Sequence, residues 1–218
     1  MRTERYRQLL PVDRLTAAAC TVIGVGAIGR QVGLQLATMG IGRAQLIDPD
    51  SVEEVNLGPQ GYLQDDLGRP KVQATADLMR RLNHELLVEE VRGRFARSLE
   101  VMPVVFCCVD SIQTRRHIWS ALRDKVDLFV DGRMAAEVLR VITVCDSVGS
   151  DRYPRTLFAE REALAQPCTA RSTIYCANAA AGIMVCQFAR WLRGMPVDFD
   201  VTLNLLALEL TISDDAGR

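Results

Sequence analysis

The sequence has no excess of charge, no leader-like start and no long run of strongly apolar residues. Its 26 Lys and Arg residues nearly balance its 27 Asp and Glu residues, which gives a formal net charge of −1. We therefore do not expect nucleic acid or an anionic membrane as a partner. The uncharged stretch 172–189 is rich in Ala, Gly, Asn and Ser and predicts a buried helix rather than a membrane span. With the charged start MRTERYRQLL, these features favour a cytoplasmic location.

The sequence also lacks the cysteine patterns of disulfide-rich and zinc-binding proteins. It has seven cysteines, an odd number, and no C-x-x-C pair. We therefore expect reduced thiols and no zinc. All the cysteines except Cys168 fall in predicted strands or helices or at their ends, where a small buried side chain is the ordinary interpretation. His84 and His117 lie in predicted helices without a paired acid or cysteine, and we interpret both as structural.

Strand and helix patterns alternate over the first two thirds of the chain. This alternation predicts an α/β fold, a Rossmann-like doubly wound mostly parallel sheet with additional antiparallel strands at the C-terminal end. Strands are predicted at 20–25, 44–48, 87–91, 104–109, 128–131, 138–145 and 201–212. Helices are predicted at 28–39, 71–83, 111–125 and 173–192, with irregular segments at 50–68 and 146–167. Residues 1–19 are expected to form a helical arm and residues 20–218 one domain.

A glycine cluster follows the first predicted strand. Gly24, Gly26 and Gly29 form G-x-G-x-x-G at the start of a predicted helix. The first glycine allows a tight turn, the second allows a phosphate to approach the backbone, and the third allows close packing of helix and strand. Asp48 ends the second predicted strand, where a carboxylate can accept hydrogen bonds from ribose hydroxyls. The pattern predicts a nucleotide site and leaves NAD and ATP open.

The residues after Asp48 favour ATP. Lys71 begins a predicted helix, the end at which a cation is disfavoured by the helix dipole, so a nearby polyphosphate would explain it better than solvent exposure. Asp110 follows the apolar run VVFCCV, at the carboxyl end of a predicted central strand where open α/β sheets bind ligands. A carboxylate close to phosphates requires a cation between them, and Mg²⁺ is the usual one.

Several motifs in order resemble the ThiF/MoeB/HesA family, which has the ubiquitin-activating-enzyme-like fold. They are RYRQL, GVGAIG, LIDPDSVEEVNL, GRPKVQAT, CVDS and the late alanine-rich helix, and they cover roughly residues 4–195. The resemblance implies that 20–218 is an adenylation domain, which uses ATP and Mg²⁺. It also implies a homodimer that adenylates the C-terminal carboxylate of a ubiquitin-like or sulfur-carrier β-grasp protein.

The resemblance assigns roles to individual residues. Asp48 would hold the ribose, while Asn56, Gln60 and Lys71 would face the phosphates. Asp110 would bind Mg²⁺. The residues predicted to hold the nucleotide are Gly24, Gly26, Ala27, Ile28, Gly29, Asp48, Asp50, Asn56, Gln60 and Lys71.

Two further residues are catalytic candidates besides Lys71 and Asp110. Arg7, with Arg5 as the other possibility, matches an arginine that reaches across a dimer into the partner's site. Cys168 lies in EALAQPCTARST, a polar loop before the late helix, where the helix start and Arg171 would lower a thiol pKa. A cysteine stands at about this place in sulfur-transfer members, so Cys168 is either a nucleophile or an ordinary loop residue.

The sequence departs from the family pattern in ways that keep alternatives open. The family usually reads N-L-x-R-Q, and this chain has NLGPQ, with Pro59 at the arginine position. Arg69 or Arg133 could compensate. We also expect neither the paired zinc cysteines of many members nor an added ubiquitin-fold domain. The alternatives are a non-catalytic adenylation-domain partner subunit and an NAD-dependent oxidoreductase.

Overall fold

Eight strands form one sheet in a computed structural model that describes residues 8–157 and 173–213. The strands are β1 (Ala19–Ile23), β2 (Arg43–Ile47), β3 (Leu87–Val91), β4 (Val104–Cys107), β5 (Leu128–Ala135), β6 (Val138–Val144), β7 (Asp200–Asn204) and β8 (Glu209–Ile212). The helices are α1 (Val12–Ala17), α2 (Ala27–Met39), α3 (Glu54–Gln60), α4 (Lys71–Leu82), α5 (Ile112–Leu122), α6 (Ser147–Arg152) and α7 (Ile174–Leu192), with short turns η2 (Gln64–Asp66) and η3 (Tyr153–Thr156).

The order of the strands places a topological switch beside the glycine cluster. The sheet runs β3-β2-β1-β4-β5-β6-β7-β8, and its pairs are parallel from β3 to β5 and antiparallel from β5 to β8. Ile23, at the end of β1, pairs with Ile47 on one side and Cys107 on the other. The predicted fold class is confirmed, and ligands of such sheets bind where the strand order reverses.

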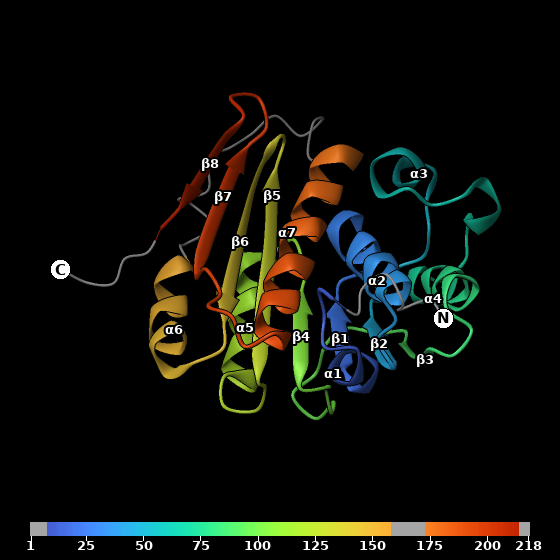
Figure 1. The fold of residues 1–218 in the computed structure, drawn as a ribbon. Coiled ribbons are helices and arrows are strands. Elements are labelled where there is room, and N and C mark those ends of the chain that lie inside the picture. The colour runs from blue at the N-terminus through green and yellow to red at the C-terminus, as the bar shows by residue number, and fades with distance from the viewer. Residues whose placement is uncertain (1–7, 158–172, 214–218) are drawn as a thin grey trace.

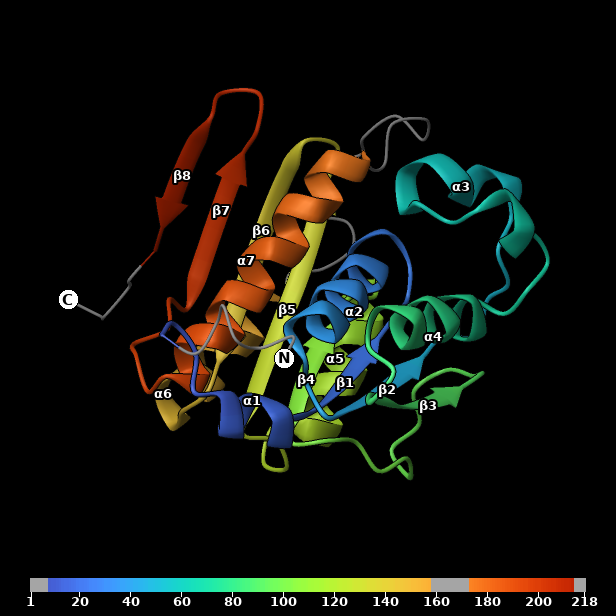
Figure 2. The same cartoon turned by 45° about the vertical axis from the view of Figure 1, so that its right-hand side comes forward.

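Helices cover both faces of the sheet (Figures 1 and 2). On one face α2 packs against both α4 and α7, and the buried residues there include Val32, Met79 and Phe188. On the other face α5 contributes Ile118 and Trp119 to a second apolar cluster. The central strands are apolar on both sides because both sides are covered. This double layer fixes the ends of β1, β2 and β4, from which the candidate site is built.

Three segments differ from the sequence-based expectation. The predicted irregular segment 50–68 contains α3 and η2, and 146–157 contains α6 and η3. Asp146 caps α6 by accepting a 2.7 Å hydrogen bond from Gly149 N–H. The single strand predicted at 201–212 is instead the hairpin β7–β8, and the side chain of Asn204 accepts hydrogen bonds from Leu206 and Ala207 N–H in its turn.

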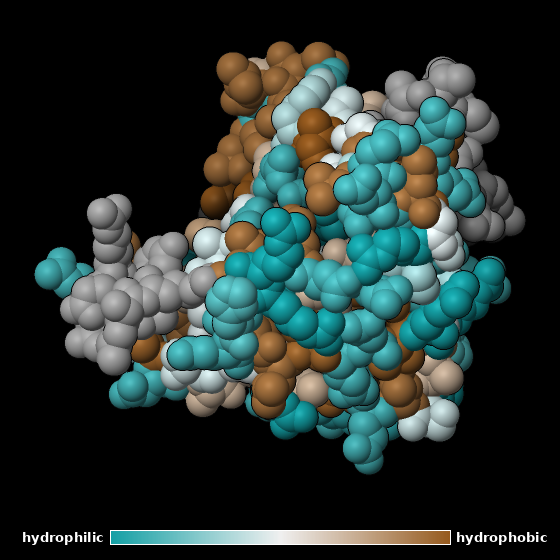
Figure 3. Space-filling view, turned by 90° about the vertical axis from the view of Figure 1, so that its right-hand side faces the viewer, coloured by the Kyte–Doolittle hydropathy of each residue, from teal (hydrophilic) through white to brown (hydrophobic). Residues whose placement is uncertain are grey.

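The helices of the described residues were compared with the length and apolarity that a membrane span needs. Within 8–157 and 173–213, no helix is both long enough and apolar enough to cross a bilayer. Figure 3 looks onto the face that carries α3 and α4, and much of this face is hydrophilic.

Leu15 of α1 is fully buried in the main core, so this part of the predicted arm packs onto the domain. The boundary between residues 19 and 20 stays a prediction.

Candidate nucleotide site

The glycine loop joins β1 to α2 in a conformation that needs at least two of its glycines. Gly24 has a φ of +88°, which side-chain-bearing residues rarely adopt, and its N–H donates to Ile47 O at 2.8 Å. A Cβ on Gly29 would lie 1.8 Å from Gly24 O. A Cβ on Gly26 would fit without a clash, because among the described residues it would meet Gln60 Oε1 alone within 4 Å, at 3.9 Å. The loop therefore forms a cradle whose floor is the backbone at Gly26.

The start of α2 presents free backbone donors to this cradle. Gly26 is the N-cap residue, has no side-chain cap, and no acidic residue occupies the first turn. The first intrahelical bond of the helix is from Arg30 N–H to Gly26 O, at 3.0 Å. Ala27 and Ile28, both predicted to hold the nucleotide, lie in this first turn. Within the part of the chain that the structure describes, the N–H groups of this turn have no acceptor, and together with the helix dipole they favour an anion at this position.

Asp48 ties the end of β2 to the glycine loop. Its Oδ2 accepts a 2.6 Å hydrogen bond from Val25 N–H, and its Oδ1 accepts one of 2.9 Å from Asp50 N–H. Burial raises the pKa of Asp48, against the lowering effect of these two hydrogen bonds. Each carboxylate oxygen keeps a second lone pair, so Asp48 can hold the loop and still accept a ribose hydroxyl.

Lys71 is a buried cation at the first position of α4. Its side chain is 8% exposed, and its Nζ lies 3.4 Å from Oδ2 of Asp50, whose side chain is 63% exposed. The alternative of a solvated surface lysine is therefore wrong. The pair places one positive and one negative group after β2, on the side of the glycine loop that α3 and α4 flank.

The two predicted amide ligands on α3 differ in their bonding. Oδ1 of Asn56 accepts a 3.0 Å hydrogen bond from Glu53 N–H, and this forms half of a capping box. Oε1 of Gln60 is buried without a hydrogen-bond partner among the residues that the structure describes. This oxygen lies 3.9 Å from the position that a Cβ on Gly26 would take, so the Gln60 carboxamide has polar capacity left for a ligand beside the loop.

Asp110 lies beyond β4, three residues after Cys107, and is exposed. Its carbonyl oxygen accepts a 3.1 Å hydrogen bond from Arg115 Nη1. Residues 8–157 and 173–213 contain no group of three or more His, Cys, Asp or Glu residues that could hold a metal. A single carboxylate suits Mg²⁺ only when phosphate oxygens and water complete its coordination, so the donor set fits a nucleotide-bound ion and not an all-protein site.

A buried ionic cluster beside Asp110 was not identified from the sequence. Asp131, fully buried in β5, accepts hydrogen bonds of 2.8 Å each from Arg115 Nε, Arg133 Nε and the Tyr153 hydroxyl. Burial favours the neutral acid, but Arg115 and Arg133 outweigh it and lower the pKa of Asp131. No motif marks this cluster, because its members come from β5, α5 and η3.

The two arginines expected to compensate for Pro59 are both engaged elsewhere. Arg133 donates to Asp131 and, from Nη1, to Thr156 O at 2.7 Å. Arg69 forms ion pairs with Asp66 and Asp77. Among the described residues neither guanidinium hydrogen bonds to the glycine loop. The guanidinium of Arg30 lies over the ring of Tyr62, whose hydroxyl donates to Val25 O in this loop. Arg30 was not predicted to belong to the site, although it directly follows Gly29 of the glycine motif.

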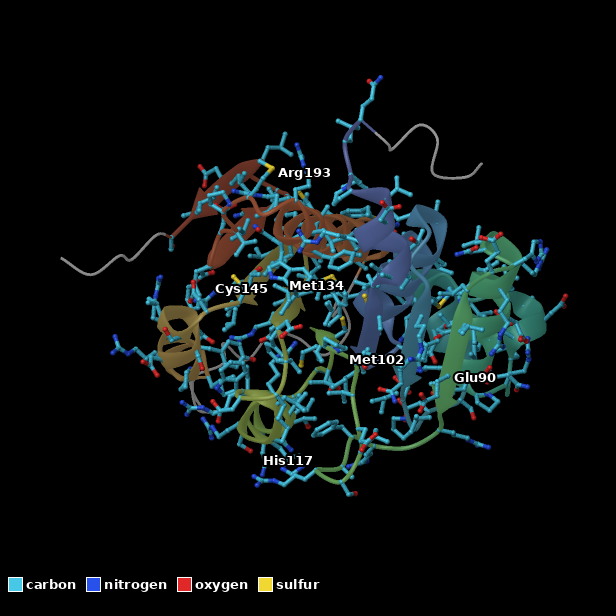
Figure 4. All side chains as sticks on the ribbon, turned by 60° about the horizontal axis from the view of Figure 1, so that its bottom comes forward. Glu90, Met102, His117, Met134, Cys145 and Arg193 are labelled. Atoms are coloured by element: carbon cyan, nitrogen blue, oxygen red, sulfur yellow. The ribbon has the colours of Figure 1, made fainter. Side chains whose placement is uncertain are left out.

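Arg7, Arg5 and Cys168 lie outside the described residues. Among the other cysteines Cys20, Cys107 and Cys176 are buried, whereas Cys186 is exposed, which corrects the expectation that it is buried. His117 lies on α5 (Figure 4) and packs edge-on against Phe95 with ring centroids 6.0 Å apart.

A hollow of about 570 Å³ lies away from the glycine loop. Trp119, Phe129, Val144 and Asp146 are among its lining residues. It opens near the start of β5 and the end of β6, which is the edge of the sheet opposite the carboxyl ends of the parallel strands. It therefore adds nothing to the cradle formed by Gly26 and Gln60.

Comparison with known proteins identifies the family. A model described as "ThiF family" matches residues 7–208. The chain belongs to the ThiF family. It is 36% identical over 86 residues to the SAMP-activating enzyme E1 of Haloferax volcanii, covering 39% of this chain and 32% of that protein. It is 29% identical over 115 residues to the sulfur carrier protein ThiS adenylyltransferase of Escherichia coli, covering 50% of this chain and 46% of that protein.

Solved structures agree on the fold of this ThiF-family chain. PaaA superposes with a TM-score of 0.77 at 22% identity, over 92% of this chain and 65% of that one. Escherichia coli MccB with ATP superposes with a TM-score of 0.71 at 18% identity, over 92% and 64%. The chain spans less than half of the curated relatives named above and about two thirds of these solved chains.

Proposed function

We propose that this chain is an adenylyltransferase that uses ATP to activate the C-terminal carboxylate of a ubiquitin-like or sulfur-carrier protein. The observation that carries the proposal is the cradle at Gly26, which, among the residues that the structure describes, is bordered by N–H groups of α2 without acceptors and by the unpartnered Oε1 of Gln60. Membership of the ThiF family supports the same reaction, since relatives named as adenylyltransferases match the chain.

In the proposed reaction one oxygen of the substrate carboxylate attacks the α-phosphorus of ATP. The bond from that phosphorus to the oxygen bridging to the β-phosphorus breaks, and pyrophosphate leaves with the bonding electrons. An acyl-adenylate remains. Catalysis of this kind depends mainly on positioning and on positive charge near the phosphate oxygens, because the protein forms no covalent bond in this step.

The chain's own residues divide this work. The start of α2 and Lys71 supply positive charge to the phosphates. Asp48 binds the ribose, and by accepting a hydrogen bond from Val25 N–H it also stabilises the conformation of the glycine loop. Asp110 is the residue that would hold Mg²⁺, which when bound neutralises phosphate charge. An NAD-dependent oxidoreductase would leave both Lys71 and Asp110 without a role.

The proposed partner rests on what the relatives are named for. The Escherichia coli relative is named for a sulfur carrier protein, and the Haloferax volcanii relative is named as an activating enzyme. A small β-grasp protein that ends in glycine is the substrate class that we propose, with a homodimer as the active assembly. Subsequent transfer to a cysteine is a separate step that Cys168 would perform.

The test is ATP–pyrophosphate exchange by the purified chain with a panel of β-grasp proteins. We expect exchange that depends on both ATP and one carrier. Gly26→Val, which fills the cradle, should lower exchange on the order of a hundredfold, as misplacement of reacting groups does. Gly58→Val is the matched control, because a side chain at this exposed glycine meets nothing within 4 Å.

Two results would contradict the proposal. ATP binding without exchange under any condition would favour the non-catalytic partner subunit. Binding of NAD in preference to ATP, with Gly26→Val abolishing it, would favour the oxidoreductase.

A further inference from the structure

Arg30, the residue after Gly29, carries a buried positive charge that lies against Tyr62. It is the largest of the fully buried side chains and is 1% exposed. Its Nε and Nη2 donate to Gly61 O at 3.2 and 3.0 Å, and its Nη1 donates to Thr75 Oγ1 at 3.3 Å. The guanidinium carbon lies 4.1 Å from the centre of the Tyr62 ring. All of these partners are neutral.

A buried guanidinium without an anion is energetically unfavourable. Within 8–157 and 173–213 no ion pair includes Arg30, and burial lowers its pKa, against the opposing effects of Tyr62 and Asp66. The oxygens of Asp66 accept hydrogen bonds from Arg69 and from Leu63 N–H. The charge of Arg30 is therefore compensated only in part by this region of the chain.

The position of Arg30 indicates that an anionic ligand in the cradle would balance its positive charge. Its backbone N–H closes the first turn of α2, and helical side chains lean toward the N-terminus of their helix. The ring that it covers belongs to Tyr62, whose hydroxyl donates a 2.6 Å hydrogen bond to Val25 O in the glycine loop. A cation near a helix N-terminus is also opposed by the helix dipole. An anion in the cradle at Gly26 would relieve both unfavourable terms.

We propose that Arg30 is a specificity-determining residue of this site. Its positive charge makes the site bind a nucleotide more tightly the more negative charge its phosphates carry. The inference rests on the proposed nucleotide site and goes beyond it, because it assigns the preference for a triphosphate to a residue that does not touch the ligand. Lys71 is less suited to set this preference, since Asp50 already lies 3.4 Å from its Nζ. Arg30 has no such partner among the described residues.

The experiment measures binding of adenosine, AMP, ADP and ATP by calorimetry, without Mg²⁺ so that Asp110 is not involved. The variants are Arg30→Met, which removes the charge, and Arg30→Lys, which keeps it. Arg80→Met is the control with the same change in net charge, because Arg80 is partly exposed and pairs with Asp77 and Glu90.

Arg30→Met should weaken ATP binding roughly tenfold or more and adenosine binding less than about twofold, because a charge effect grows with the charge of the ligand. Arg30→Lys and Arg80→Met should keep the wild-type preference for ATP over adenosine. An equal loss for all four ligands in Arg30→Met would show a purely structural role and overturn the inference.

Three other results would also test the role of Arg30. If circular dichroism shows that Arg30→Met does not fold, Arg30→Gln, which also removes the charge, takes its place, and loss of the preference for ATP in Arg30→Lys overturns the inference. An unchanged preference in a folded Arg30→Met overturns it as well, while the proposed function stands. If the wild-type chain binds none of the four compounds, the proposed function fails and this inference fails with it.

Discussion

Arg115 Nη1 donates a 3.1 Å hydrogen bond to the carbonyl oxygen of Asp110. The same guanidinium donates from Nε to Asp131 at 2.8 Å and from Nη2 to Gly132 O at 2.9 Å. The turn that carries Asp110 is therefore held by an arginine whose own position is fixed by a fully buried carboxylate. This relationship separates two functions: Asp110 is exposed and available to a ligand, and Asp131 is buried and unavailable.

The first prediction concerns Asp110. Asp110→Ala should abolish most adenylate formation, since loss of charge stabilisation at a transferring phosphoryl group costs about 3 kcal/mol. The fold should be unaffected, because only the backbone of Asp110 is hydrogen bonded to Arg115. The measurement is Mg²⁺-dependent ATP–pyrophosphate exchange, with Asp124→Ala, at a position 82% exposed, as the control. Exchange within a few-fold of wild type would remove Asp110 from the site.

The second prediction concerns stability at low pH. Because the pKa of Asp131 is lowered in the folded state, its contribution is present above its unfolded pKa and is lost as pH falls through the folded pKa. At neutral pH, Asp131→Asn should destabilise the protein by about 3–5 kcal/mol, the usual effect of breaking a buried ion pair. The difference should shrink below the ordinary aspartate pKa of 3.8.

Urea denaturation from pH 7 down to pH 3 measures this difference. Asp146→Asn is a control, since it weakens the N-cap of a short helix and does not remove a buried charge. Equal destabilisation by Asp131→Asn at all pH values would contradict the assignment of the Asp131 pKa.

The fold was predictable because the apolar runs that form β1, β2 and β4 are buried on both faces. α3 was missed because EVNLGPQ contains a glycine and a proline, and its start is stabilised by the side chains of Glu53 and Asn56 rather than by an apolar face. The hairpin was missed because NLLALEL has no Gly or Pro, and its turn depends on Asn204 and on Leu208 with a φ of +54°.

Residues of the candidate site were predictable from the sequence only where their place at the end of a predicted strand or helix determines where they lie in the fold. The glycine loop, Asp48 and Lys71 lie at ends of elements that the pattern defines. Arg30 could not be recognised as a buried charge, since Gly61 and Thr75, which surround it, are more than thirty residues away along the chain. The same reason hides Asp131, whose hydrogen-bonding partners come from separate elements.

The third prediction concerns Arg7, which we propose crosses to the nucleotide site of the partner in a homodimer. Mixed dimers of Arg7→Ala and Lys71→Ala chains should recover part of the activity, because one of the two sites then has both groups. The measurement is exchange activity after mixing differently tagged chains and isolating the mixed dimer. Asp124→Ala mixed with Lys71→Ala is the matched control. No recovery in isolated mixed dimers would show that Arg7 acts within its own chain or not at all.

The last prediction concerns Cys168, which separates an enzyme that delivers its adenylate directly from one that first captures the carrier on a thiol. Cys186 is exposed and would obscure the comparison, so the measurement uses a Cys186→Ser background. Burial raises the pKa of Cys176 to about 11, and this thiol should therefore react slowly with an alkylating agent at neutral pH. Cys168 should be labelled first in a peptide map.

Cys168→Ala should prevent any thiol-sensitive link to the carrier, seen on a non-reducing gel, while pyrophosphate exchange continues. Exchange should survive because the thiol would attack only after pyrophosphate has left, with the adenylate as its target and AMP as the leaving group. The matching control is Cys176→Ala, which should leave the link intact. If Cys168 is labelled no faster than Cys176 and its alanine variant completes the whole reaction, the adenylate itself is the activated product that this protein delivers.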